Sequence, residues 1–376
     1  MNNYTTPSDN TVLVLDSVGQ PLRTEVRPIP KAGYGSVVIR VLAASIRANS
    51  PSVYEDPESG HPLPIPFVPG FAAIGKIHEA GPDASRLKPR QLVFFDPYIR
   101  GRDNDEAIYV SGLMHWYNEA SGKLAKDIWR DSTYAQYARV PLENCHPLDE
   151  RLLASLEDGG LDYTIEDLTH MFSMLIPFGG LADIDVKAGE TIIIAPATGR
   201  YGSAAVHLTL AMGAKVIAVG RNTRVLSEIS GISSRVRTVQ LSNEVEEDTN
   251  AIMAAAQNPI EAFWDMSPMA ASASSHFQSC LRALSIGGRV SIMGAVSPDV
   301  GFGYMDILVR GLTIKATLMC TMEQTKRMIR MVETGVLPLA TRAKMGKVKT
   351  FGLPQWGQAF NYARDHKEPG EVVFIP

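Results

Sequence analysis

The sequence has little cysteine and no long apolar run. Its three cysteines, Cys145, Cys280 and Cys320, are far apart in a chain of 376 residues. That number and spacing argue against a disulfide framework and a zinc cluster, and they favour a reducing compartment. No stretch approaches the roughly 20 apolar residues of a membrane-spanning helix, and no basic segment with an apolar core opens the sequence. We therefore expect a cytoplasmic protein with no membrane partner.

The sequence also has no large excess of positive or of negative charge. The chain has 36 Lys and Arg residues against 40 Asp and Glu residues, for a net charge of −4 at pH 7. Nothing in this balance attracts nucleic acid or an anionic membrane, so we expect neither as a partner. Hydrophobic residues make up 45% of the chain and charged residues 20%. This composition is ordinary for a globular enzyme, and the length favours two domains.

The most informative stretch that is present covers residues 191–222. It opens with a β-branched apolar run at residues 191–195, which is typical of a strand buried on both faces. After a turn, the small and apolar residues 203–212 predict a helix, for which Gly213 is a suitable C-terminal cap. A second apolar run at residues 215–219 completes a strand–helix–strand unit.

Two glycines make the turn of this unit a candidate phosphate site. Gly199 and Gly202 let the backbone approach a phosphate and let helix and strand pack without an intervening Cβ. The free N–H groups of the helix N-terminus would face the anion. Only two glycines of the three-glycine fingerprint are present, so an ordinary tight turn is the alternative. We expect Tyr201 to lie along the cofactor and Arg200 to reach solvent or a phosphate. The predicted cofactor contacts of the turn are Thr198, Gly199, Arg200, Tyr201 and Gly202.

The second strand ends in Gly220, Arg221 and Asn222. Arg221 stands 22 positions after Gly199. An NAD enzyme carries an acidic residue for the ribose 2′-hydroxyl at roughly 20 positions. An arginine without a neighbouring carboxylate favours the 2′-phosphate instead, so we predict that these three residues bind NADPH.

The rest of the chain divides by pattern. Residues 1–165 contain many short strands with proline and glycine turns, which predict a compact β-barrel-like domain. Within it, residues 100–130 are polar and are expected to be irregular. Residues 166–334 alternate strands with helices, which predicts a parallel sheet covered by helices on both faces. The tail, residues 335–376, ends in a strand and is expected to return to the first domain.

These features resemble the medium-chain dehydrogenase/reductase superfamily over nearly the whole chain. The resemblance rests on VIRVLAASI, PFVPGFAAIGKIHEAG, YAQYARVP, VKAGETIIIAPATGRYGSAAV, GGRVSIMGA and the final EVVFIP. It implies an α/β protein in which a GroES-like catalytic domain is interrupted by a Rossmann domain with a doubly wound parallel sheet. The family binds its cofactor in the cleft between these domains. It also commonly forms homodimers through an edge strand, for which the apolar residues 312–319 are the candidate.

Several departures from the family concern metal. Zinc-dependent members carry a cysteine where Arg47 stands and a histidine where Phe71 follows Gly70. They also hold a structural zinc with four closely spaced cysteines, and residues 100–130 contain none. Guanidinium and phenyl groups cannot serve as zinc ligands, which are Cys, His or carboxylate groups. We therefore expect both zinc sites to be absent, and the chain resembles the zinc-free quinone and enoyl reductases.

The resemblance also assigns candidate catalytic residues. Arg47 lies in a loop that lines the family's cleft, and it is a candidate donor to a substrate oxygen that gains charge during hydride transfer. A surface ion pair is the alternative for Arg47. Tyr54, just downstream, is a second candidate donor, with simple packing as its alternative. The aromatic group His115, Trp116 and Tyr117 either caps the pocket or packs locally.

Further cofactor contacts follow from matched family positions. Thr169 matches a residue that hydrogen-bonds the cofactor near the nicotinamide, although an ordinary helix threonine is the alternative. We interpret His170 and His207 as structural, and Cys320 as a buried, inert thiol. The segments expected to approach the cofactor contain Met293, Gly294, Met319 and Cys320.

The combined hypothesis is a zinc-independent, NADPH-dependent reductase of an activated C=C bond in specialised metabolism. The small-molecule substrate would be an enone, an enoyl compound or a quinone. A carbonyl reductase is the alternative enzyme. A protein that binds NADPH for a redox-neutral or non-catalytic role is the alternative of another class. Because the family's loop residues are replaced, its substrates do not transfer to this chain.

Overall fold

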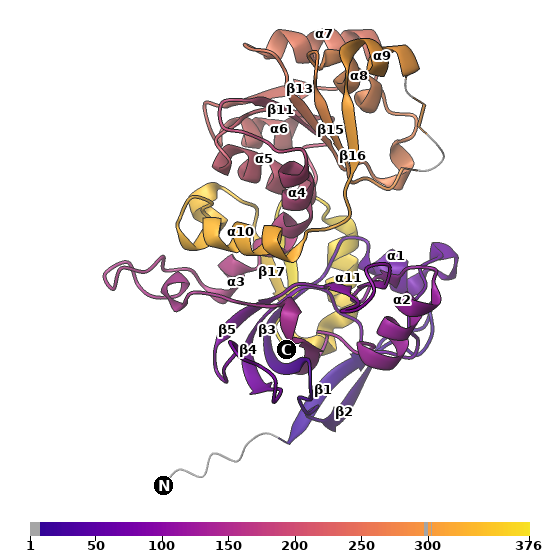
Figure 1. Cartoon of the computed structure of the whole chain (residues 1–376), viewed down its shortest axis with the longest axis vertical. Coiled ribbons are helices and arrows are strands. Elements are labelled where there is room, and N and C mark those ends of the chain that lie inside the picture. Colours follow the sequence, from indigo (N-terminus) through magenta and orange to yellow (C-terminus); the bar gives the residue numbers. More distant parts are fainter. Residues whose placement is uncertain (1–7, 297–299, 302) are drawn as a thin grey trace. The chain divides into compact units, whose positions relative to one another are not determined.

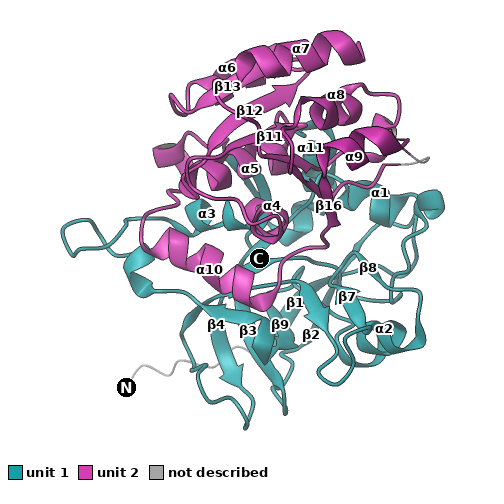
Figure 2. Cartoon of the chain, turned by 45° about the horizontal axis from the view of Figure 1, so that its top comes forward, with its two compact units in different colours: residues 1–172, 348–367, 371–376 teal, residues 173–347, 368–370 magenta. Residues whose placement is uncertain are grey.

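The chain forms two compact units, which Figure 2 shows in different colours. The computed structural model describes residues 8–296, 300–301 and 303–376. Unit 1 contains the described residues up to Phe172 together with Val348–Lys367 and Glu371–Pro376. Unit 2 contains Ser173–Lys347 and Glu368–Gly370. The segment after residue 334 therefore stays in unit 2 up to Lys347, and Lys344 Nζ anchors it there by donating to the Gly231 carbonyl at 2.7 Å.

A parallel sheet of six strands forms the centre of unit 2, in the order β13-β12-β11-β14-β15-β16. Every neighbouring pair is parallel. The strand order reverses between β11 and β14, which is the doubly wound arrangement and confirms the predicted Rossmann fold class. The strands are β11 (Thr191–Ala195), β12 (Lys215–Gly220), β13 (Val236–Gln240), β14 (Ala262–Asp265), β15 (Arg289–Ile292) and β16 (Thr313–Ala316).

Helices cover this sheet. The pair α7 and α8, which pack against each other beside the sheet (Figure 1), bury Ile252 and Leu281 against Ile193 and Ile217 of the strands. This apolar layer positions the strand ends that carry the candidate site. The helices are α4 (Met171–Asp183), α5 (Arg200–Ala211), α6 (Thr223–Ser230), α7 (Val245–Ala255), α8 (His276–Ala283), α9 (Tyr304–Arg310) and α10 (Met322–Glu333).

Unit 1 is built on a sheet of seven strands with the path β10-β5-β4-β3-β18-β17, and β9 also pairs with β3. The last strand, β18, pairs antiparallel with β3, with Phe374 opposite Ala44, so the C-terminal end of the chain lies in unit 1. A separate hairpin joins β1 and β2. The strands are β1 (Asp9–Val14), β2 (Arg23–Pro28), β3 (Ser36–Ser45), β4 (Ala73–Ala80), β5 (Leu92–Phe95), β9 (Tyr137–Pro141), β10 (Cys145–Pro147), β17 (Val348–Phe351) and β18 (Glu371–Phe374).

The expectation that residues 100–130 are irregular is wrong. A small antiparallel sheet contains β6 (Tyr98–Arg100), β7 (Ile108–Val110) and β8 (Met114–His115). Helix α2 (Glu119–Lys123) follows, and Asn118 caps it by accepting from the Ser121 N–H at 2.7 Å. The structure is local and short, so neither a long apolar period nor an alternation reveals it in the sequence.

Aromatic packing holds the short helices of unit 1 on its sheet. Tyr54 of α1 (Ser50–Glu55) lies 6.0 Å from Phe360 of α11 (Trp356–Asp365), measured between ring centroids. Tyr134 packs edge-on against Phe374 at 4.8 Å. The first contact joins α1 to α11, and α11 in turn packs on β17 and β18 of the sheet. The remaining helix of unit 1 is α3 (Ile165–Leu168).

Candidate functional site

The glycine turn of unit 2 leads directly into α5. Gly199 is the N-cap residue, with extended backbone angles, and α5 begins at Arg200, three positions before the expected start. The early start places the first N–H groups of the helix in the predicted turn, where they are available to an anion. Arg200 is buried, at 8% exposure, so the expectation that it reaches solvent is wrong.

Gly202 serves close packing of the helix against the strand end. A Cβ at this position would lie 2.0 Å from the Pro196 carbonyl oxygen and 2.8 Å from the Ala197 Cα. Gly220 is similar, because its Cβ would lie 2.7 Å from the Thr198 side chain. These contacts correct the interpretation of Gly202 as a wall of the phosphate site, since the space it leaves is filled by protein backbone.

A cleft of about 490 Å³ lies at the carboxyl ends of the strands of unit 2. Arg221 and Thr198 from the predicted set line it, beside residues from the loops after β13 and β14. This is the edge of a doubly wound sheet at which ligands bind. The lining residues are Pro196, Thr198, Gly220, Arg221, Leu241, Asn243, Pro268, Ala271, Ala273, Ser274 and His276.

An acidic residue lies closer to this site than the sequence indicates. Asn222 caps α6, accepting from the Val225 N–H at 3.2 Å, and its amide lies 3.4 Å from a Glu368 oxygen. Glu368 also forms an ion pair with Arg224. The expectation of no neighbouring carboxylate is therefore wrong, because residues 368–370 return to unit 2. The pairing with Arg224 offsets the charge of Glu368 and leaves Arg221 as an exposed cation on the cleft.

A buried polar network that sequence reasoning missed forms part of the cleft. Asp265, at the end of β14, accepts a hydrogen bond from the Ser267 hydroxyl, and the Ser267 oxygen lies 2.6 Å from His276 Nε2. His276 Nε2 is 3.4 Å from Asp265, and its Nδ1 is 2.7 Å from the Ser274 hydroxyl. A Cβ on Gly294 would lie 2.9 Å from an Asp265 carboxylate oxygen, which explains the glycine there. The sequence feature that could have indicated this network is Asp265, an acidic residue at the end of an otherwise apolar, buried strand.

The other predicted cofactor segments of unit 2 pack on α4. Met293 Sδ is 3.2 Å from the Trp264 indole nitrogen. Met319 has a left-handed backbone, with φ of 59°, and its carbonyl oxygen would lie 1.9 Å from a Cβ on Gly179 of α4. Cys320 is buried and donates to the Leu175 carbonyl. These contacts agree with an inert thiol.

In unit 1, the predicted residue Arg47 lies in the loop between β3 and α1. Its side chain is 4% exposed, and Nη2 donates to the Gly112 carbonyl at 3.2 Å. The guanidinium carbon lies 4.5 Å from the centre of the Phe71 ring, a cation–π contact. The alternative of a surface ion pair is therefore wrong, because Arg47 is neither exposed nor paired with a described carboxylate.

Tyr54, the second predicted donor, has a hydrogen-bond partner within the protein. Its hydroxyl donates to the same Gly112 carbonyl, so its proton is engaged within the protein. Burial raises the pKa of Tyr54, and the neighbouring Arg47 charge opposes this shift. We therefore reinterpret Tyr54 as a residue that positions the Gly112 carbonyl and, through it, Arg47. Gly112 itself has φ of 65° and lies so close to Gly70 that a Cβ would be 1.8 Å from the Gly70 oxygen.

His61 joins this group and was not singled out by the sequence. Its pKa is lowered first by burial and then by the charge of Arg47, so the ring is neutral at physiological pH. Its Nδ1 atom is buried and has no hydrogen-bond partner among the described residues. We call Arg47, Tyr54, His61, Phe71 and the Gly112 carbonyl the Arg47 cluster.

The remaining predicted residues of unit 1 make local contacts. The Thr169 hydroxyl donates to the Glu166 carbonyl at 2.6 Å, as an ordinary helix-end threonine does. His115 Nδ1 is 2.7 Å from the Trp116 carbonyl. Tyr117 is 78% exposed and its hydroxyl donates to the Gly60 carbonyl, so this side chain makes little packing. His170 is buried, and so is His207 of α5 in unit 2.

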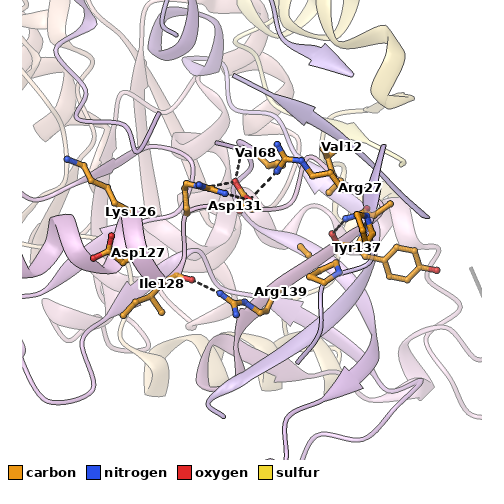
Figure 3. A pocket seen from close by; sticks show the side chains of 16 residues that line it. Val12, Arg27, Val68, Lys126, Asp127, Ile128, Asp131, Tyr137 and Arg139 are labelled. Carbon is orange, nitrogen blue, oxygen red and sulfur yellow. Dashed lines mark hydrogen bonds and ion pairs between the residues drawn. The ribbon is translucent and has the colours of Figure 1, made fainter. Parts of the chain in front are cut away.

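A second hollow in unit 1, of about 320 Å³, contains none of the predicted residues (Figure 3). Three of its cations have partners: Arg27 lies 3.3 Å from Asp131, Arg130 pairs with Asp131 at 3.1 Å, and Arg139 donates to the Ile128 carbonyl at 3.0 Å. Lys126 also lines the hollow. We base the functional proposal on the Arg47 cluster, which contains the predicted residues Arg47 and Tyr54.

The residues present do not fit a zinc ion. The resemblance sets Arg47 and Phe71 against two zinc ligands of the family, and in this structure the two side chains stack on each other. A guanidinium offers no lone pair to a metal and would repel its charge. Among the described residues, no group of three or more His, Cys, Asp or Glu side chains is arranged to hold a metal ion.

Comparison with known proteins identifies a dehydrogenase or reductase of a family that uses a nicotinamide cofactor. The family model "Alcohol dehydrogenase GroES-like domain" matches residues 33–150, and the model "Zinc-binding dehydrogenase" matches residues 202–334. The L-threonine 3-dehydrogenase of Anaeromyxobacter dehalogenans (strain 2CP-C) is 21% identical over 353 residues, 92% of each chain. The chain belongs to the medium-chain dehydrogenase/reductase superfamily.

Solved structures share this fold. A short chain alcohol dehydrogenase from E. coli CFT073, complexed with NADH, has a TM-score of 0.77 at 16% identity and covers 98% of this chain and 100% of its own. A crotonyl-CoA carboxylase/reductase has a TM-score of 0.76 at 15% identity, covering 98% of this chain and 89% of its own. Within the described residues, no helix is both long and apolar enough to cross a membrane.

Proposed function

We propose that the protein is a zinc-independent, NADPH-dependent reductase of an activated C=C bond. The observation that carries this proposal is Arg47, a buried cation stacked on Phe71 where zinc-dependent relatives place metal ligands. A fixed cation provides what the metal would otherwise provide, which is stabilisation of negative charge on a substrate oxygen. The thiols of Cys145, Cys280 and Cys320 are all buried, in agreement with a reducing compartment such as the cytoplasm.

The cleft of unit 2 supports NADPH as the cofactor. Thr198, the α5 N-terminus and Arg221 would hold it, with the arginine on the 2′-phosphate. NADPH bound there would supply a hydride to the β-carbon of the substrate. The α-carbon would take a proton from water, so that the C=C bond would be saturated and NADP⁺ formed. Arg47 would stabilise the enolate oxygen that forms between these two steps.

A carbonyl reductase is the second candidate, because the relatives named above include an alcohol dehydrogenase and a threonine dehydrogenase. Oxidation of NADPH, followed by its absorbance, with matched enones, quinones and aldehydes separates the two. We expect turnover of enones or quinones and little turnover of saturated aldehydes. Turnover confined to aldehydes would assign the carbonyl reductase. Tight NADPH binding without turnover of any panel member would assign a redox-neutral or non-catalytic role.

Metal dependence gives a separate prediction. The active protein should contain no stoichiometric zinc by elemental analysis, and prolonged treatment with a chelator should leave NADPH oxidation unchanged. The physical reason is that Arg47 and Phe71 supply no lone pair to a metal. One tightly held zinc ion per chain would contradict this assignment.

A further inference from the structure

Arg47 carries a positive charge that the described protein does not balance. The guanidinium is buried, and its partners among the described residues are a carbonyl, a hydroxyl group and an aromatic ring. None of these carries a negative charge, because the pKa of Tyr54 is raised and its hydroxyl stays protonated. Burying a charge without a counter-charge costs free energy, and proteins usually offset it with an ion pair.

The cluster also has unused hydrogen-bonding capacity. Arg47 Nε and His61 Nδ1 are both buried, and neither has a partner among the described residues. Buried donors are nearly always satisfied in folded proteins, so an unsatisfied pair at one place points to a ligand. A guanidinium edge is suited to a carboxylate, which accepts two parallel hydrogen bonds.

From this arrangement we propose that the substrate is a monoanion whose carboxylate binds Arg47. The inference rests on the proposed function and names its substrate class: carboxylates conjugated to, or one bond away from, the reducible C=C bond, such as 4-oxo-2-enoates. The neutral His61 ring adds a hydrogen bond but no second positive charge, which favours one negative charge over a phosphate or a dicarboxylate. Phe71 below the guanidinium would pack against the carbon chain.

The test compares a carboxylate with its neutral ester. The wild-type protein is assayed for NADPH oxidation with trans-4-oxo-2-pentenoate and with its methyl ester. We expect kcat/KM for the acid to exceed that for the ester by about tenfold or more, the range of a charge-assisted hydrogen bond. The preference should be constant from about pH 6 to about pH 9, because arginine and carboxylate keep their charges there. Equal or higher kcat/KM for the ester would overturn the inference and leave the proposed function intact.

Variants then assign the preference to this side chain. Arg47→Met keeps an apolar stem and removes the charge, so it should lower kcat/KM for both compounds and should lower that for the acid about tenfold more than that for the ester. Arg47→Lys should retain part of the preference. Arg40→Met, at an exposed arginine of the preceding strand β3, is the matched control. It should leave kcat/KM for the acid and kcat/KM for the ester unchanged. A preference that survives in Arg47→Met would overturn the inference.

Binding measurements separate this inference from failure of the proposed function. The saturated product, 4-oxopentanoate, and its methyl ester are titrated into the NADP⁺ complex by calorimetry. Tighter binding of the acid, lost in Arg47→Met, would support the inference even if no compound is turned over. If the wild-type protein binds acid and ester alike and Arg47→Met weakens NADPH binding, the missing anion belongs to the cofactor and the inference is wrong. The acid and ester comparison on wild type stands even if the variant fails to fold.

Discussion

We expect the side chain of Arg221 to determine the preference of the protein for NADPH over NADH. It is exposed on the cleft of unit 2 and forms no ion pair with a described carboxylate. A contact between its guanidinium and a 2′-phosphate contributes roughly 1.5–3 kcal/mol. Arg221→Ala should therefore weaken NADPH binding about tenfold or more and leave NADH binding almost unchanged, as measured by fluorescence titration.

The control for this prediction is Arg237→Ala, an exposed arginine that donates to nearby carbonyls at the start of β13. This variant should leave the binding affinities for NADPH and for NADH unchanged. Equal loss of NADPH and NADH affinity in Arg221→Ala would reject the role in selectivity. The nearby Glu368 would then be the candidate for binding a ribose hydroxyl of NADH, because Asn222 lies beside it.

Substitution of His276 is expected to affect both the stability of the protein and its binding of NADPH. His276 is 3% exposed, and its Nε2 lies 2.6 Å from the Ser267 hydroxyl and 3.4 Å from an Asp265 oxygen. Removing the imidazole leaves these buried polar groups without a hydrogen-bond partner, which costs about 3 kcal/mol. His276→Leu should lower the unfolding free energy by about that amount in urea denaturation and should also weaken NADPH binding. Ser274→Ala removes only one hydrogen bond and should cost about 1 kcal/mol. Equal effects of the two variants would contradict these contacts of His276.

The close contact between α5 and the end of β11 requires a glycine, because there is no room for a side chain at position 202. A Cβ on Gly202 would lie 2.0 Å from the Pro196 oxygen, and this atom is backbone, so it cannot rotate away. Gly202→Ala should destabilise the protein by about 1–3 kcal/mol, as overpacking does. It should also weaken NADPH binding, because the turn moves. A loss of binding in this variant would therefore come with a loss of stability, and not from a folded protein with a blocked phosphate site.

A glycine on another helix provides the contrast. A Cβ added to Gly357 of α11 would meet no atom within 4 Å, and the φ of this residue is not left-handed. Gly357→Ala should therefore raise stability by about 0.5–1 kcal/mol, because alanine is the better helix residue. Both variants are measured by urea denaturation. A neutral Gly202→Ala would show that the helix and strand are not as closely packed as described.

The whole chain is expected to act as a homodimer. Strand β16 lies at the edge of the sheet of unit 2. Helix α9 buries none of its residues, and its Tyr304, Leu308 and Val309 are each at least 60% exposed. An unpaired strand edge beside exposed apolar side chains is typical of a surface that pairs with a second copy.

Light scattering should therefore give twice the mass of one chain at micromolar concentration. Charge introduced by Leu318→Asp or Leu308→Asp should shift the protein to monomer, because a carboxylate would be buried without a partner. Val26→Asp, at an apolar position of unit 1 that is 63% exposed, is the control and should leave the mass unchanged. A monomeric wild-type protein would refute the dimer.

Local sequence patterns were sufficient to predict the central strands of unit 2 and the C-terminal cap of α5. Residues 191–195 form a continuous apolar run, and residues 262–264 form another that ends at Asp265. The structure places β11 at Thr191–Ala195 and β14 at Ala262–Asp265, the bounds expected from the sequence. Gly213 adopts φ of 90° just after α5, as expected for a C-terminal cap. Such predictions succeed because a strand buried on both faces, or a left-handed cap, restricts residue type at the position itself.

Contacts between distant residues were decided only by the tertiary structure. Whether Arg47 is exposed or buried depends on Phe71 and on the carbonyl of Gly112, which lies 65 positions away. Likewise, Glu368 reaches Asn222 across 146 positions, and Ser267 links Asp265 to His276 only once α8 packs on the sheet. The sequence alone determined the strand–turn–helix–strand unit and the types of residue at its ends. Folding determined which charges meet, because electrostatic and hydrogen-bond energies depend on distances that chain order does not contain.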